Sequence, residues 1–417
     1  MKKLLIVFIG LLCISNSATA QGASDKESYR RSSLCLIMLT HRDKKYAEGM
    51  ERVFRNFPLP ARYNEHNISN LRVISVKGKQ SQADIDKIVT DNCVAQKMVG
   101  RWFNRNNYSG FMNMDLIHER GGYGAFYADY QRSQSNIRGT ALLRDEGIEL
   151  LQSSFVLVCD MDYIDQSRGS RWIAGIMAVA SAAASVAGEV QKQNGNKEAG
   201  ERLSVAGDVG MAGAQVVADI GGFRVKMNAY LYKLCWDDNL TQTMYRDYWV
   251  DAETPAEEVE ARKAKFDAAG KSFNVEFVGK YSESSTKTIL KSWSNEDEVI
   301  LDVCHRCVTK GMRELAKTFP IFRPRAPFYF EGSSMYSHIG RKEDVAYGKE
   351  YEIIQPYKDK KGQICYKRIG KAKAGTPWEN LNIRFDEYFD PQWKGTSFTY
   401  GHASEDLHTP GLQLREL

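Results

Sequence analysis

The chain has 417 residues, which is enough for two or three domains with a sizeable hydrophobic core. Aromatic residues make up 11% of it and charged residues 26%, a balance that excludes an intrinsically disordered protein. The formal net charge is only +5, and the basic residues are spread along the chain, so the composition argues against a nucleic-acid-binding protein.

The first twenty residues have the organisation of a secretory signal peptide. Two lysines precede the apolar run 4–14, and Ala18-Thr19-Ala20 supplies the small residues of a cleavage site. Cys13 follows two leucines and not the small residue that a lipoprotein signal requires. We therefore predict an exported protein, periplasmic or associated with the outer membrane, whose mature chain begins near Gln21 without a lipid anchor.

Residues 31–319 are predicted to form a mixed α/β sheet domain, because strand patterns alternate with helical ones. The predicted elements of its first half are strands over 34–40 and 71–76, a helix from 82 to about 103 capped by Ser81, a helix over about 128–151, and a strand over 155–158.

An Ala/Gly-rich stretch, 172–222, is predicted to be a helical hairpin inserted into this domain, with its turn at 193–196. Each helix carries a seam of small side chains, and such seams let helix backbones approach closely. The seam residues are our candidate interaction sites: Ala174, Ala178, Ser181, Ser185 and Gly188 in the first helix, and Ala206, Gly210 and Gly213 in the second.

The hairpin could contact a protein or a membrane. Its first helix is near the lower limit of about 17–25 apolar residues for a membrane span. The second helix carries Asp208 and Asp219, each of which would be costly at bilayer depth. The pattern favours a hairpin that covers a sheet, a protein partner or a second copy of the chain, with peripheral membrane contact as the alternative.

The second half of the α/β domain contains four further predicted elements. They are a strand over 223–236, a charged helix over 251–270, a strand over 273–278 and an amphipathic helix over 296–318. Three prolines between 320 and 327 then mark a linker. Short strands with recurring glycines over 330–385 predict an SH3-like β-barrel, and 386–417 is predicted to be an irregular C-terminal tail that packs through its aromatic residues. The predicted fold class is therefore α+β.

Cysteine and histidine provide little support for a redox or metal site. The seven cysteines of the mature chain are odd in number and widely scattered, which does not suggest a disulfide framework. Cys304-His-Arg-Cys307 has redox spacing but lies inside the predicted helix 296–318, so structural cysteines or one local disulfide are favoured over catalysis. The histidines do not pair at metal-binding spacings, and we predict no metal or cofactor.

Asp160-Met-Asp162 is the main enzymatic candidate, since it ends the strand 155–158 as the DxD motif of haloacid-dehalogenase-like phosphatases does. Asp237-Asp238, after the strand 223–236, resembles their later acidic pair. Such carboxylates would bind Mg²⁺, and the first would attack phosphate. However, Tyr163 and Ile164 stand where smaller or hydroxylated residues are expected, and acidic residues are common turn formers.

Three segments resemble parts of known envelope proteins. Glu146–Val158 resembles the helix-to-strand stretch of curli-secretion-like and TolB N-terminal-like periplasmic domains. Ile339–Ile353 and Gly362–Lys371 resemble the barrel of flagellar assembly protein T. The layout of the whole chain is similar to that of uncharacterised exported proteins of Bacteroidetes. The resemblance implies an envelope assembly or scaffold role and brings no catalytic residues, while the missing lipobox and transmembrane hairpins argue against a curli-type pore.

These observations predict a non-enzymatic, exported cell-envelope protein with an assembly, scaffold or interaction role and no nucleic-acid partner. Two alternatives remain open. The first is a Mg²⁺-dependent phosphatase that uses Asp160 and Asp162. The second is a protein that inserts into membranes or oligomerises through 172–222.

Overall fold

The computed structural model describes residues 32–41, 47–66, 68, 71–104, 113, 151–165, 220–251, 254–290, 296–359, 364–376, 395–409 and 411–417. These residues belong to two compact units, an α/β unit that ends at Pro324 and a β unit that begins at Arg325. Within the described residues, no helix is both long enough and apolar enough to cross a membrane.

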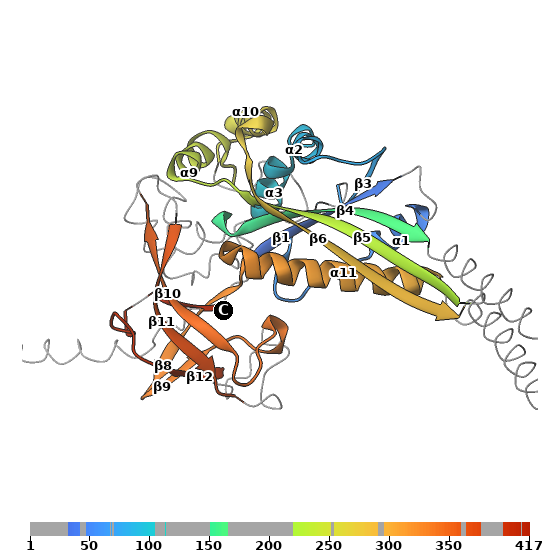
Figure 1. Cartoon of the computed structure of the whole chain (residues 1–417). Coiled ribbons are helices and arrows are strands. Elements are labelled where there is room, and N and C mark those ends of the chain that lie inside the picture. Colours follow the sequence, from blue (N-terminus) through green and yellow to red (C-terminus); the bar gives the residue numbers. More distant parts are fainter. Residues whose placement is uncertain are drawn as a thin grey trace, which may run out of the picture. The chain divides into compact units, whose positions relative to one another are not determined.

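A mixed sheet forms the centre of the α/β unit (Figure 1). Its strands are β1 (Ser33–His41), β2 (Asn64–Glu65), β3 (Val73–Val76), β4 (Ser154–Asp165), β5 (Ile220–Leu234) and β6 (Val275–Leu290). The order is β2-β1-β4-β5-β6, with β3 also paired to β1. Strands β2, β3 and β4 run parallel to β1, whereas β5 runs antiparallel to both of its neighbours, β4 and β6. All nine residues of β1 are buried, as expected for a central strand of apolar sequence.

Helices cover both faces of this sheet. The helices are α1 (Ala47–Arg55) and α11 (Glu296–Thr318) on one face, and α2 (Gln82–Asp91) and α3 (Val94–Phe103) on the other (Figure 1). Side chains alternate between the two faces along each strand. Thus Met38 packs in the core beneath α11 and α1, while its neighbour Ile37 packs in the core beneath α2 and α3.

The structure refines several predicted elements. The predicted helix 296–318 is confirmed with the same bounds, and Ser81 caps α2 with a capping box that includes Asp84. The helix predicted to reach Phe103 is broken at Cys93, which has a φ of 49°. The side chain of Asn92 donates to the Ile88 carbonyl at 2.8 Å, and this local bond competes with continuation of the helix.

The predicted strand 273–278 is much longer than expected, since β6 continues to Leu290. Its second half is rich in Ser and Thr and lacks the apolar alternation of a half-buried strand, which is why the sequence pattern missed it. The predicted hairpin 172–222 and the helix 128–151 lie almost entirely outside the described residues. Ile220, Gly221 and Gly222, which the prediction assigned to the hairpin, instead belong to β5.

The described part of the α/β unit also contains five short or charged elements: α9 (Asp238–Thr243), the π-helix η1 (Met244–Tyr248), α10 (Ala256–Ala268) and the 3₁₀ turns η2 (Gly270–Ser272) and η3 (Pro320–Phe322). Helix α10 confirms the charged helix predicted over 251–270.

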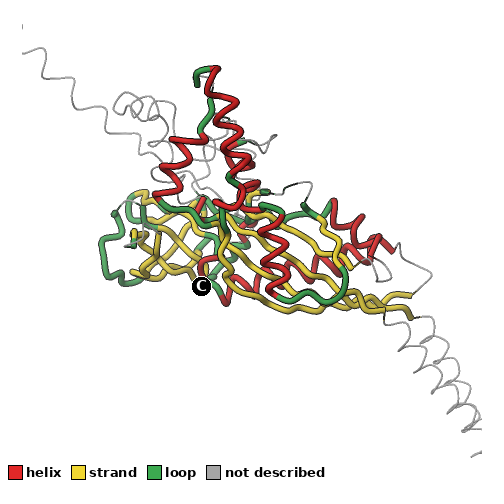
Figure 2. Tube along the Cα trace, turned by 90° about the horizontal axis from the view of Figure 1, so that it is seen from above, coloured by secondary structure: helices red, strands yellow, loops and turns green. Residues whose placement is uncertain are grey.

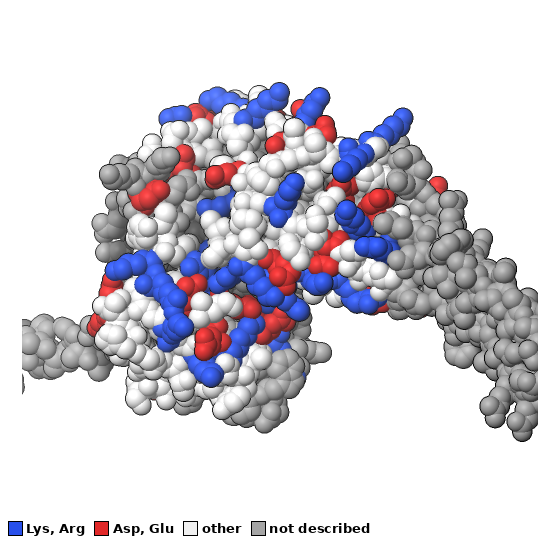
Figure 3. Space-filling model, in the orientation of Figure 1, with Lys and Arg blue, Asp and Glu red and all other residues white. Residues whose placement is uncertain are grey.

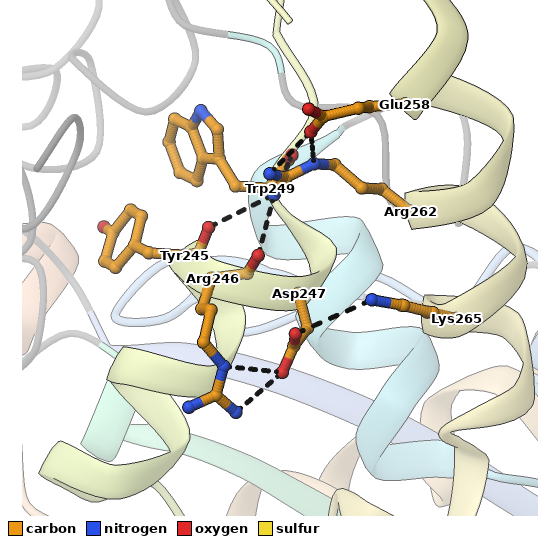
Figure 4. A network of polar contacts seen from close by, with 7 residues as sticks. All are labelled: Tyr245, Arg246, Asp247, Trp249, Glu258, Arg262 and Lys265. Carbon is orange, nitrogen blue, oxygen red and sulfur yellow. Dashed lines mark hydrogen bonds and ion pairs between the residues drawn. The ribbon is translucent and has the colours of Figure 1, made fainter.

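A polar network fastens α10 to the π-helix (Figure 4). The Arg262 side chain forms an ion pair with Glu258 at 2.9 Å and donates to the backbone carbonyl of Arg246 at 2.9 Å. Carbonyl groups at a helix end have no partner within the helix, and Arg262 supplies one. Asp247 accepts from Arg246 at 2.7 Å and lies 3.8 Å from Lys265. We interpret this network as a structural anchor.

The β unit is a nearly closed, barrel-like antiparallel sheet with the order β7-β13-β10-β11-β12-β9-β8. Its strands are β7 (Arg325–Pro327), β8 (Tyr329–Glu331), β9 (Ser334–Ser337), β10 (Glu350–Lys358), β11 (Ile364–Ala374), β12 (Thr396–Tyr400) and β13 (Gln413–Glu416), and one 3₁₀ turn, η4 (Arg341–Glu343), follows β9. Only Phe328 separates β7 from β8, so the two ends of the sheet are adjacent parts of one bent segment. This continuity nearly closes the sheet around a core that includes Met335, Ile353 and Phe398.

Two of these strands correct the prediction of an irregular tail over 386–417. Strand β12 pairs with β9 and β11, and β13 pairs with β10 and β7. Both strands are short, and β13 contributes a single apolar side chain, Leu414, to the core. A segment of four residues with one buried side chain gives almost no periodic signal in the sequence.

Candidate functional site

The most distinctive polar site lies where the parallel strands end. After β1 the chain passes through α1 to β3 on one side of β1, and β4 then pairs on the other side. The strand order therefore reverses between β1 and β4. In open α/β sheets, ligands bind outside the carboxyl ends of the strands at such a reversal. His41 is the last residue of β1. Asp160, on β4, is paired with Leu39 of β1.

His41 and Asp160 form a buried pair at this position. The distance from His41 Nε2 to Asp160 Oδ1 is 2.6 Å, and the two side chains are only 7% and 5% exposed. Both lie on the sheet face that α2 and α3 cover further along, since Ile37 and Val158 precede them at even spacing on the same face. Burial raises the pKa of the neighbouring Tyr230 phenol, and the Asp160 carboxylate raises it further.

The two acidic motifs of the phosphatase hypothesis do not come together. Asp160 lies opposite Asn228 on β5, and β5 then runs antiparallel to β4 toward Asp237. Six residues of strand separate Asn228 from Leu234, where β5 ends, a distance of about 20 Å at about 3.3 Å per residue, and Asp237 follows three residues later. Asp237 is instead the N-cap of α9, where its Oδ1 accepts the Leu240 backbone N–H at 2.7 Å. Asp162 lies on the same face of β4 as Asp160, but the later acidic pair is at the opposite end of the sheet.

No group of three or more potential metal ligands gathers in the part of the chain that the structure describes. Figure 3 shows that acidic and basic side chains are interspersed over the visible face and do not separate by sign.

Cys304 and Cys307 are buried side chains of α11 in the core between α11 and the sheet. Both have 0% exposure, and the Cys307 thiol lies 4.0 Å from the Val225 carbonyl of β5. All of the described cysteines are free thiols, so the local disulfide considered from the sequence is absent from this pair. Burial raises the pKa of Cys307 to about 12 and also raises that of Cys304. A reactive redox thiol needs a lowered pKa, so the structure supports a packing role for both residues.

We predict that Cys304 and Cys307 resist alkylation in the native protein at pH 8 and react only after unfolding. A raised pKa keeps each thiol protonated far above neutral pH, and burial excludes the reagent. Peptide mass mapping after a pulse of iodoacetamide, with and without denaturant, measures this, and the partly exposed Cys365 serves as the internal control. Rapid native labelling of Cys307 at the rate of Cys365 would contradict the packing role.

The eight candidate interaction residues between Ala174 and Gly213 lie outside the described residues. The structure does describe the two strands that their segment connects. The β4–β5 pairing continues to Asp165 and Phe223, and the β5–β6 pairing continues to Ile220 and Leu290. Residues 166–219 are therefore inserted at the far end of a ribbon made of β4, β5 and β6, which Figures 1 and 2 show extending past the other strands.

His41 was not predicted from the sequence. Asp160 was a sequence candidate without a partner, because the two residues are 119 positions apart and no motif joins them. The usable signal was a titratable residue at the end of a strand with a continuous apolar run, a position that parallel pairing brings to the carboxyl edge of the sheet.

Comparison with protein-family models gives no match for this chain, and comparison with curated proteins gives none either, so its function is inferred from the residues and the geometry above.

Proposed function

We propose that this protein is an exported, non-enzymatic component of the cell envelope that holds a protein partner through the inserted segment 172–219. The observation that carries the proposal is the position of the insertion at the end of the β4–β5–β6 ribbon. The signal-peptide pattern and the resemblance to envelope proteins supply the expected location.

The residues that flank the insertion lie beyond the end of β1. Asp160 is level with Leu39, so Asp165 lies about three residues, or about 10 Å, beyond the end of β1. The described core beneath α11 includes Leu36, Leu157 and Val303. In this proposal, the insertion contacts another molecule and this core packs without it.

The β unit is proposed to be an SH3-like barrel that serves as a second interaction module. A small antiparallel sheet, nearly closed by the bent segment β7–Phe328–β8, supports this assignment. Tyr347, Tyr357 and Tyr400 are 70%, 53% and 43% exposed, so each is accessible to a partner of this unit.

The phosphatase alternative has weaker support. The first aspartate of such a site must be open to phosphate and to Mg²⁺. Here Asp160 is 4% exposed and bonded to His41, and Asp237 is committed to capping α9. Phosphatase activity that needs Mg²⁺ and disappears in both Asp160→Asn and Asp162→Asn would favour the enzyme over the scaffold.

Replacing residues 166–219 with a short Gly/Ser linker is expected to leave a folded protein that has lost its partner contact. The linker joins Asp165 directly to Ile220, and the two strands it connects are already paired neighbours. Near-UV circular dichroism and urea unfolding of the purified variant measure folding. Collapse of the whole chain would show that the insertion is part of the core.

Two substitutions within the insertion sharpen this test. Gly210→Leu and Ser181→Leu place bulky side chains in the predicted seams, and overpacking typically costs about 1–3 kcal/mol. Both should weaken partner retention in a crosslinking assay, while Gln193→Leu in the predicted turn should not. Equal effects of all three variants would contradict the assignment of the seams.

A further inference from the structure

Strand β6 is the last strand of its sheet, and its outer backbone edge has no pairing strand in the part of the chain that the structure describes. The edge is long, since β6 spans 16 residues. Unpaired strand edges readily accept another strand, so proteins protect them with bulges, prolines or charged side chains. From Tyr281 to Thr286 the only charged residue is Glu283, and it is just 7% exposed.

Glu283 occupies part of this edge. Its Oε1 accepts the backbone N–H of Ser284 at 2.8 Å, and the same oxygen lies 3.0 Å from Nζ of Lys310 on α11. An N–H group that points toward β5 donates to a backbone carbonyl of β5. The Ser284 N–H donates to the Glu283 side chain instead, so it points toward the outer edge of β6. Because outward groups alternate along an antiparallel strand, the N–H groups of Ser282 and Thr286 face the same way.

We propose that the outer edge of β6 is a docking edge for β6 of a second copy of this chain, and that the Glu283 carboxylate keeps the edge closed in the free protein. The edge is self-complementary. Two copies related by a two-fold axis pair antiparallel, and an axis at Ser284 places Ser282 opposite Thr286 on both sides. Small hydroxyl side chains are favourable cross-strand neighbours, and no like charges oppose each other over Ser282–Thr286.

Removing the carboxylate should open the edge. We expect Glu283→Thr to dimerise at least tenfold more tightly than the wild-type chain in sedimentation equilibrium, whereas Ser285→Thr should behave like wild type. Adding Ser284→Pro to Glu283→Thr should restore the monomer, because proline deletes the outward N–H at the centre of the paired edge. A dimer built through residues 172–219 would not respond to either substitution, so this result is separate from the proposed function.

Hydrogen exchange of the wild-type protein, resolved to single residues, is the second measurement and needs no variant to fold. The Ser284 amide should exchange slowly, while the Ser282 and Thr286 amides exchange rapidly. A folded Glu283→Thr variant with wild-type association would overturn the proposal. So would a dimer that persists with Ser284→Pro, or equal protection of all three amides.

Discussion

His41→Ala is expected to lower the free energy of unfolding by about 1–3 kcal/mol, the usual cost of leaving a buried polar group without its hydrogen-bond partner. The substitution leaves the Asp160 carboxylate buried without its 2.6 Å partner. Asp160→Asn should cost less, since an amide oxygen can still accept a hydrogen bond from the imidazole. Urea unfolding followed by tryptophan fluorescence measures these changes.

The exposed ion pair Arg52–Asp297 provides the matched control. It has a similar separation, 2.9 Å, but its side chains are 59% and 42% exposed. Water and salt screen such a pair, so Asp297→Ala should leave stability close to that of the wild type. If His41→Ala were as mild as Asp297→Ala, the buried pair would not be a structural element of the sheet.

Gly279→Ala is expected to destabilise the α/β unit by about 1–3 kcal/mol or more through overpacking. A Cβ atom at position 279 would overlap the ring of Phe319, which packs against β6 at this point. An aromatic ring cannot bend away as the end of a flexible side chain can. Thermal and urea unfolding of the variant measure the cost.

Gly311→Ala, in the middle of α11, is the control for this substitution. Its Cβ would come within 2.5 Å of Cε of Met227, the movable end of a flexible side chain. Helix propensity favours alanine over glycine by about 1 kcal/mol, which offsets the adjustment of Met227. Truncating the ring in the double variant Gly279→Ala/Phe319→Ala should recover part of the loss, and simple additivity of the two substitutions would contradict the clash.

The sequence predicted those elements whose apolar pattern is strong. Strand β1 is a continuous apolar run, helix α11 has clear amphipathic periodicity, and Ser81 begins α2 with a recognisable capping box. The second half of β6 escaped prediction because its Ser/Thr-rich pattern reflects pairing with β5 and not burial. Strand β13 escaped because long-range pairing, which no local pattern encodes, defines it.

The candidate site was predictable only in part. Asp160 stood out at the end of an apolar strand, but its role depends on parallel pairing with β1, which brings His41 beside it. The similarity of Asp237-Asp238 to a catalytic acidic pair was misleading for the same reason. The direction of β5, and not the local motif, decides that these residues lie at the other end of the sheet.

The most direct test of the proposed envelope role is site-specific photo-crosslinking in cells that produce the full chain. A photoreactive residue at Ala178, in the predicted seam, is compared with one at Glu257 on the exposed face of α10, and the products are analysed in the envelope fraction. The account predicts a discrete crosslinked product at Ala178 and none at Glu257, with the mature chain starting near Gln21. An unprocessed chain in the cytoplasm without a crosslinked product at Ala178 would contradict it.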